Sequence, residues 1–259
     1  MLPILITIGP FSLKTLNLFL VLTLFVSSFI FWRFGREEHY KEDQLFDAFL
    51  SSFIAGLVFA RIVYVLINFQ EYGWNVLSWM NIWADPGFAI LPGLLGASVY
   101  LFRHATKQKW EQYAILDMWM PAILGGAVVL ELGLFFDRPI QGLFGFSEWW
   151  ASSHLWLAVI FGIIAWYARF SEFRYRTFSW YKRKHQVAQT GYVFGLGLVL
   201  SGIALALAEV LIYIQNITAI SITSILGVSG VIIGGLAVWI LRSGFFSQFR
   251  SRKKPIAHA

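Results

Sequence analysis

Long apolar stretches separated by short polar connections dominate this chain. A bilayer core of about 30 Å needs roughly 20 helical residues, and the stretches approach or exceed that length. We therefore predict an all-α integral membrane protein with a single transmembrane domain over residues 1–259. The predicted spans are seven, at approximately 13–33, 45–69, 87–103, 113–136, 149–170, 191–214 and 219–241.

The third stretch is the shortest and contains Pro92, Gly93 and Gly96. It is interpreted either as a broken or re-entrant helix that lines a cavity, or as a short tilted span. Glycines also recur in the sixth and seventh stretches. Small residues let helices approach closely, so packing within the chain is favoured over oligomerisation.

Composition agrees with a membrane protein, because 58% of the residues are hydrophobic and 13% are charged. Soluble domains are typically about 25% charged. Many of the 12 tryptophans lie near the ends of the apolar stretches, as interfacial residues do. The chain has no cysteine, so it forms no disulfide or thiolate of its own.

The basic residues predict the orientation of the spans. With seven spans, 17 of the 20 lysines and arginines fall on one side of the membrane. The positive-inside rule then places the amino terminus outside and the carboxy terminus in the cytoplasm. A net charge of +6 distributed in this way does not indicate nucleic acid binding.

Two further expectations concern the segments outside the spans. The first stretch is expected to be a retained span and not a cleaved signal peptide, because its positive charges follow the apolar residues. The outward loops 70–86 and 137–148 are rich in tryptophan, phenylalanine and glycine, and we expect them to lie along the membrane surface.

Arg61, Glu131 and Glu209 are charged residues that lie inside long apolar runs of three predicted spans. A charge in the hydrocarbon core costs about 2.5–3.5 kcal/mol on insertion scales, so such residues usually face a cavity or one another. We expect all three to converge on one lipid-accessible cavity. Arg61 either binds a lipid phosphate through two hydrogen bonds or pairs with one of the glutamates.

His154 precedes the apolar part of the fifth span, within ASSHLWLAV. An imidazole at this place is a candidate general base, and the alternative is a capping or packing residue. Ser152 and Ser153 are candidate helix caps. The sequence has no metal-ligand spacing and no phosphate-binding glycine loop, so no cofactor and no metal are expected.

Several stretches share an order that goes beyond apolar composition. They are the second span at 43–66, ILPGLLGA at 90–97, LDMWMPAILGGAVVLELG at 116–133, ASSHLWLA at 151–158 and the sixth span at 191–214. In this order the chain resembles the prolipoprotein diacylglyceryl transferase family, which consists of seven-span bacterial enzymes that attach lipid to lipoproteins. The resemblance implies a multi-pass protein of the bacterial inner (plasma) membrane.

The resemblance implies transfer of the diacylglyceryl group of phosphatidylglycerol to the cysteine thiol of a prolipoprotein lipobox, with release of glycerol phosphate. The nucleophilic sulfur belongs to the prolipoprotein, whose signal peptide would be a partner together with the phospholipid. Arg61 would then bind the phosphate, and His154 or Glu209 would be the base. Tyr64 would join Glu131 and Glu209 in the polar network of the cavity, and the motif glycines would be Gly93, Gly96 and Gly133.

The chain also departs from the pattern of the family. Leu91 and Ala151 stand where the family has histidine. Glu131 and Leu205 stand where it has arginine, and His154 stands where it has glutamine. These departures favour a second hypothesis, a non-catalytic pseudoenzyme that binds lipid or a membrane partner. A third and less favoured hypothesis is a transporter, for which a broken third helix would be an argument.

Overall fold

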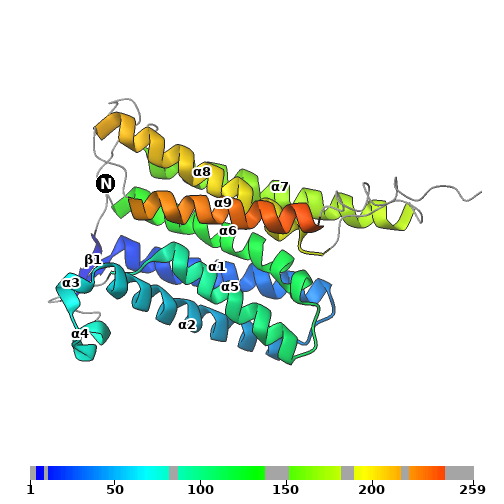
Figure 1. The fold of residues 1–259 in the computed structure, drawn as a ribbon, viewed down its shortest axis with the longest axis horizontal. Helices are drawn as coiled ribbons and strands as arrows, with labels where there is room; N and C mark the ends of the chain where they lie inside the picture. Colours follow the sequence, from blue (N-terminus) through cyan, green and yellow to red (C-terminus); the bar gives the residue numbers. More distant parts are fainter. Residues whose placement is uncertain are drawn as a thin grey trace, which may run out of the picture. The chain divides into compact units, whose positions relative to one another are not determined.

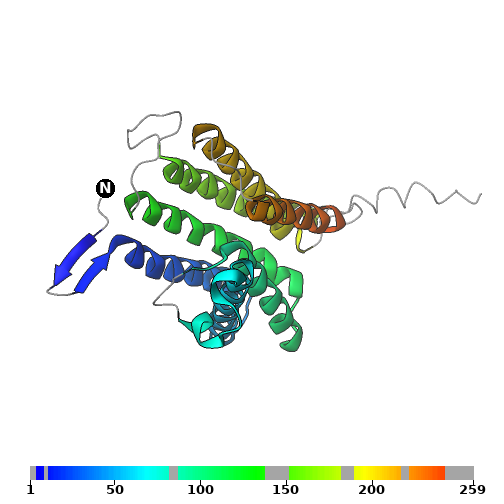
Figure 2. The same cartoon turned by 60° about the vertical axis from the view of Figure 1, so that its left-hand side comes forward.

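The computed structural model describes residues 4–8, 11–81, 87–137, 152–181, 190–216 and 222–242. A short antiparallel hairpin of β1 (Ile4–Ile8) and β2 (Phe11–Lys14) precedes the helices (Figure 2). Each predicted span contains one long helix (Figure 1). These helices are α1 (Thr15–Glu37), α2 (Glu42–Ile67), α5 (Ile90–Lys107), α6 (Gln112–Asp137), α7 (Ser153–Tyr181), α8 (Tyr192–Asn216) and α9 (Ile222–Arg242).

Among the described residues, five helices are long and apolar enough to cross a membrane. They are α1, α2, α6, the part of α7 at Ser153–Ser171 and the part of α8 at Tyr192–Val210. Large apolar side chains on these helices are exposed, including Phe25 at 64% and Trp166 at 67%, as expected of surfaces that face lipid. A helical protein with several membrane spans is therefore confirmed, whereas the count of seven and the orientation stay predictions.

The third predicted span corresponds to one unbroken helix, α5, so the broken-helix alternative was wrong, whereas the re-entrant and the short tilted alternatives both stay predictions. Pro92 is the third residue of this helix, which begins at Ile90. The amide groups of the first helical turn have no intrahelical acceptor, so proline removes no hydrogen bond there. The argument for a transporter that relied on a broken helix is lost with it.

The chain divides into two compact units. One unit comprises Trp32–Leu116 and contains α2, the short helices α3 (Phe69–Tyr72) and α4 (Val76–Met80), and α5. The other comprises Met1–Phe31 and Asp117–Ala259, and contains the hairpin, most of α1 and α6, and helices α7, α8 and α9.

In the unit of α2 and α5, the two helices pack through small residues. A Cβ atom added to Gly93 would lie 2.7 Å from the Cβ of Ala60, and one added to Gly96 would lie 2.7 Å from the Cβ of Phe59. Both distances are shorter than real contacts between side chains. The motif glycines of α5 therefore allow the close approach of α2, as small residues do between membrane helices.

In the other unit, glycines of α6 face α1, and glycines of α8 and α9 face each other. A Cβ on Gly133 would lie 2.5 Å from the Cβ of Phe19 on α1, and a Cβ on Gly195 would lie 2.6 Å from the backbone nitrogen of Trp239 on α9. The predicted packing role is confirmed for Gly195 and also for Gly235, which faces Leu198. Nothing lies within 4 Å of a Cβ on Gly230.

Some predictions fall on residues outside the described ranges. They concern the loop at 138–148, part of the loop at 70–86, and the basic residues Arg138, Lys182, Arg183, Lys184, Arg250, Arg252, Lys253 and Lys254.

Candidate functional site

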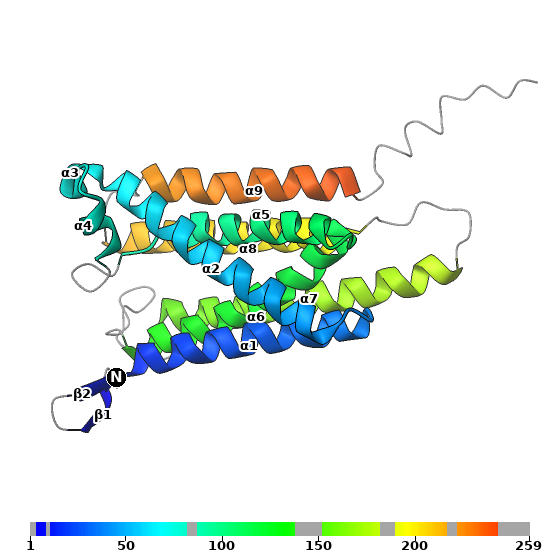
Figure 3. The same ribbon diagram turned by 90° about the horizontal axis from the view of Figure 1, so that it is seen from below.

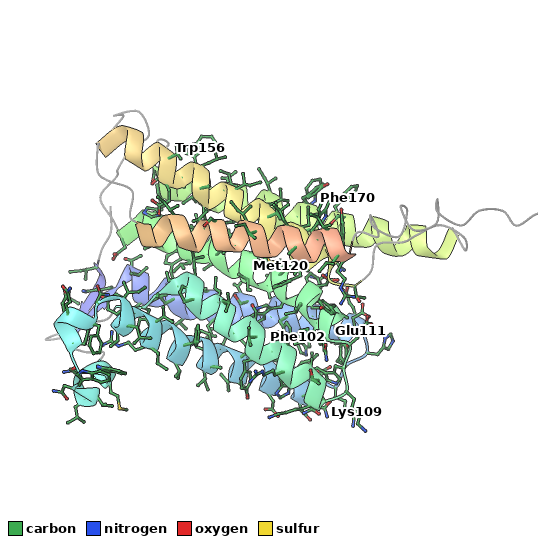
Figure 4. All side chains as sticks on the ribbon, in the orientation of Figure 1. Phe102, Lys109, Glu111, Met120, Trp156 and Phe170 are labelled. Atoms are coloured by element: carbon green, nitrogen blue, oxygen red, sulfur yellow. The ribbon has the colours of Figure 1, made fainter. Side chains whose placement is uncertain are left out.

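A histidine and a glutamate meet at one end of α6 and α7. His154 is the second residue of α7, and its Nδ1 lies 2.8 Å from Oε2 of Glu131 on α6. Their side chains are 23% and 13% exposed, respectively. Trp156, labelled in Figure 4, lies on the first turn of the same helix. A partly buried carboxylate needs a hydrogen-bond partner, and the imidazole supplies one.

The backbone at the start of α7 orients this histidine. The amide of Trp156 donates a hydrogen bond to the carbonyl of Ser152, so Ser152 occupies the N-cap position, while capping by its side chain stays a prediction. Ser152 is 3% exposed, so the helix start is packed against the rest of its unit. His154 therefore projects from a fixed first turn.

The pairing limits the proton positions on the ring. An ionised carboxylate only accepts hydrogen bonds, so an ionised Glu131 requires a proton on Nδ1 of His154. In a neutral ring of this tautomer, Nε2 carries a lone pair and can accept a proton from another molecule. The arrangement therefore has the chemistry of a general base with an orienting carboxylate.

Arg61 anchors the connection between α2 and α5 in the other unit. Its Nε donates to the carbonyl of Trp79 and its Nη1 donates to the carbonyl of Gly87, each at 2.9 Å. The guanidinium carbon lies 5.6 Å from the ring centroid of Tyr64 and 5.3 Å from that of Tyr72. Arg61 is 7% exposed, so a buried cation is stabilised here by carbonyl groups and aromatic rings.

The segment that Arg61 anchors contains α3 and α4 and lies at the carboxy-terminal end of α2 (Figure 3). The indole Nε1 of Trp79 donates to the carbonyl of Gly73 at 3.1 Å, and the Asn75 side chain accepts from the amide of Leu77 at the start of α4. Three apolar residues of the segment are exposed, at 85%, 79% and 74%: Trp74, Leu77 and Met80. The sequence placed this loop at the membrane surface but did not predict its short helices.

Sequence reasoning missed the role of Asp117. Its Oδ2 accepts a hydrogen bond from the amide of Gly191 at 2.6 Å, and its Oδ1 accepts one from the amide of Phe194 at 2.8 Å. The carbonyl of Gly191 accepts from the amide of Gly195, so Gly191 is the N-cap of α8. A glycine has no side chain to cap a helix, and Asp117 supplies the carboxylate from α6. Gly191, at the start of the sixth predicted span, was a signal for the start of this helix.

The described residues bring some of the predicted site together. Glu131 and His154 are in contact in one unit, and Arg61 and Tyr64 are in contact in the other. Glu209 lies on α8 and is half-buried, and none of the side chains that the structure describes forms a hydrogen bond or ion pair with it. The convergence of Arg61, Glu131 and Glu209 on one cavity stays a prediction.

Comparison with known proteins agrees with the resemblance seen in the sequence. The family model described as prolipoprotein diacylglyceryl transferase matches residues 3–241. Among individual proteins, a phosphatidylglycerol–prolipoprotein diacylglyceryl transferase of Clostridium kluyveri is 30% identical over 143 residues, which are 54% of each chain. Proteins of the same name from Streptococcus suis and Ligilactobacillus salivarius are 27% and 22% identical, over 54% of this chain and 52% of theirs.

The chain thus spans about half the length of the curated relatives it matches. The family model, by contrast, extends over both units and over all the long helices from α1 to α9. The chain belongs to the prolipoprotein diacylglyceryl transferase family.

Proposed function

We propose that this protein transfers the diacylglyceryl group of phosphatidylglycerol to the cysteine thiol of a prolipoprotein lipobox. The observation that carries the proposal is the family match over residues 3–241. In this reaction the sulfur attacks the glyceryl carbon that is bonded to the phosphate oxygen. A carbon–sulfur bond forms, the carbon–oxygen bond breaks, and glycerol phosphate leaves with the electron pair. The thiol proton passes to a base of the protein.

The reaction requires a membrane topology that brings the two substrates together. The proposal therefore includes seven spans in a bacterial inner membrane, with the amino terminus outside and the carboxy terminus in the cytoplasm. The helices α5 and α9 would be the two spans beyond the five that length and composition support. Phosphatidylglycerol would enter from the surrounding lipid, and the prolipoprotein cysteine would approach from the outer side.

Arg61 is the proposed phosphate ligand. The two hydrogen bonds to the carbonyls of Trp79 and Gly87 hold the guanidinium in place. A cation fixed before the reaction stabilises the charge of the departing phosphate without having to reorganise. The base would be His154 or Glu209.

The test is transfer in a defined system. The purified protein would be reconstituted in phosphatidylglycerol vesicles and supplied with a lipobox peptide, and the peptide mass would be measured. We expect the mass of the peptide to increase by one diacylglyceryl group. A peptide whose cysteine is replaced by serine should keep its original mass. The gene should also support growth of a strain that lacks its own transferase. Absence of both product and growth would reject the proposal.

The departures from the family pattern favour a second candidate, a non-catalytic pseudoenzyme that binds phospholipid or a membrane partner. The observation in its favour is the replacement of the family's histidine and arginine by Leu91 and Glu131. Such a protein would bind phosphatidylglycerol without any turnover. Its Arg61→Ala variant would melt at a lower temperature in detergent, because the loop anchored by that side chain would lose two hydrogen bonds.

A further inference from the structure

We propose that His154 and Glu131 form a dyad that accepts the proton of the attacking thiol. His154 would contact the sulfhydryl through Nε2 as the catalytic base, and Glu131 would be a positioning residue that holds the ring through Nδ1. The inference rests on the proposed function. It assigns the binding place of the prolipoprotein cysteine to the end of α6 and α7 where these two side chains meet.

The contact between the two side chains has the geometry of an orienting hydrogen bond. The Nδ1 to Oε2 distance is 2.8 Å, which is typical of a bond between a ring nitrogen and a carboxylate. Because the side chains are 13% and 23% exposed, the pair is shielded enough to be strong while part of the ring stays accessible. A thiol that approaches this ring would find Nε2 on the edge away from Glu131.

The position along the helices suits a cysteine that enters from the membrane surface. His154 is on the first turn of α7. Glu131 is six residues before the end of α6 at Asp137, which corresponds to about 9 Å along a helix axis. The pair is therefore close to the ends of both helices and not in their middle.

Charge matching supports a coupled role for the two residues. By its resemblance to the family, the chain carries glutamate where arginine is expected at position 131 and histidine where glutamine is expected at position 154. The structure shows that these two departures are in direct contact. An imidazole that takes up a proton becomes a cation, and a neighbouring carboxylate stabilises it, whereas a neighbouring guanidinium would oppose it.

The structure shows no such arrangement for the other candidate base. Among the side chains that it describes, none forms a hydrogen bond with Glu209. A positioned base accelerates proton transfer because its geometry is set before the reaction. Between the two candidates, the geometry therefore selects His154.

The test compares three variants with the wild type in the vesicle assay with the lipobox peptide. His154→Gln should lower kcat by about 10²–10⁴-fold, the usual contribution of a general base. Glu131→Gln should lower kcat as well while KM stays within about twofold, because the amide can hold the ring in the wrong tautomer. Asp137→Asn, at the end of the same helix, is the matched control and should keep the activity of the wild type. Size-exclusion profiles and tryptophan fluorescence would establish that each variant is folded.

A spectroscopic measurement separates positioning from mere packing. The chain has five histidines, and the ¹⁵N resonances of His154 would be those lost in the His154→Gln variant. We expect a ring protonated at Nδ1 in the wild type and a different tautomer distribution in Glu131→Gln. A purely structural contact would change thermal stability in Glu131→Gln without lowering kcat, and that result would overturn the positioning role.

Failures of the two proposals are distinguishable. A wild-type protein that forms no lipidated peptide would reject the proposed function and, with it, the catalytic role of the dyad. An active wild type with a fully active His154→Gln variant would overturn the dyad alone. If Glu209→Gln were then inactive, the base would be Glu209.

Discussion

Removal of the Asp117 carboxylate is expected to detach the start of α8. Asp117 is 8% exposed and accepts hydrogen bonds from the amides of Gly191 and Phe194. Gly191 is the N-cap residue and Phe194 lies in the first turn of α8, where amides have no acceptor within the helix. The partners lie 74 and 77 residues away from Asp117 in the sequence, so the carboxylate fixes one helix to another.

The magnitude follows from the number of amides that lose their acceptor. A buried donor left without a partner costs about 1–3 kcal/mol. Asp117→Asn keeps one acceptor oxygen and should lower the free energy of unfolding by about 1–3 kcal/mol. Asp117→Ala loses both acceptors and should cost about 2–4 kcal/mol after partial relaxation of the turn, roughly a 30- to 1,000-fold change in the unfolding equilibrium.

The assay is reversible unfolding in mixed micelles, combined with hydrogen exchange at the Gly191 and Phe194 amides. Both amides should be protected in the wild type and should exchange faster in Asp117→Ala, because the local opening of the turn becomes more frequent. Asp137→Asn makes the same chemical change at the other end of α6 and should shift stability by no more than about 0.5 kcal/mol. Unchanged stability and unchanged exchange in Asp117→Ala would refute the capping role.

Three further predictions test other parts of the molecule. Because the chain has no cysteine, a fluorescent label on Leu77→Cys reacts at that position alone. Quenchers attached to lipid should quench the fluorescence of this label more strongly than that of the same label on Lys107→Cys, because Leu77 is exposed in the apolar loop segment. Gly93→Val should destabilise the contact of α2 and α5 by about 1–3 kcal/mol, whereas Gly230→Ala, where nothing lies within 4 Å, should be neutral in a melting experiment. Burial raises the pKa of Tyr40 in the folded protein above its usual 10.0, so the stabilisation from the neutral phenol is complete below pH 10.0 and is lost as the pH rises through the pKa of the folded state. Tyr40→Phe should therefore lose less stability at alkaline pH than the wild type, as measured by unfolding curves at increasing pH.

The long helices could be predicted from the sequence because apolar length is a local property. The stretch predicted at 45–69 became α2 at Glu42–Ile67, and the stretch at 113–136 became α6 at Gln112–Asp137. The ambiguity at Pro92 could not be resolved in this way, since proline breaks a helix interior but is compatible with a first turn. Which case applies depends on the residue where the helix begins, and helix ends are the least certain part of a prediction from pattern.

The candidate site shows a different limit, because its contacts join residues on different helices. Glu131 was selected from the sequence as a charged residue expected to meet Arg61 and Glu209, and His154 was selected separately as a candidate base. The contact between Glu131 and His154 depends on how α6 and α7 pack. Arg61 was expected to bind a phosphate or a glutamate, and neither alternative included the carbonyls of Trp79 and Gly87 that it contacts. Backbone carbonyls occur at every position and therefore leave no mark in a sequence. Arg61 should accordingly be tested first as an anchor of the loop between α2 and α5. Its phosphate-binding role is then tested by whether Arg61→Ala abolishes transfer in a protein whose loop remains folded.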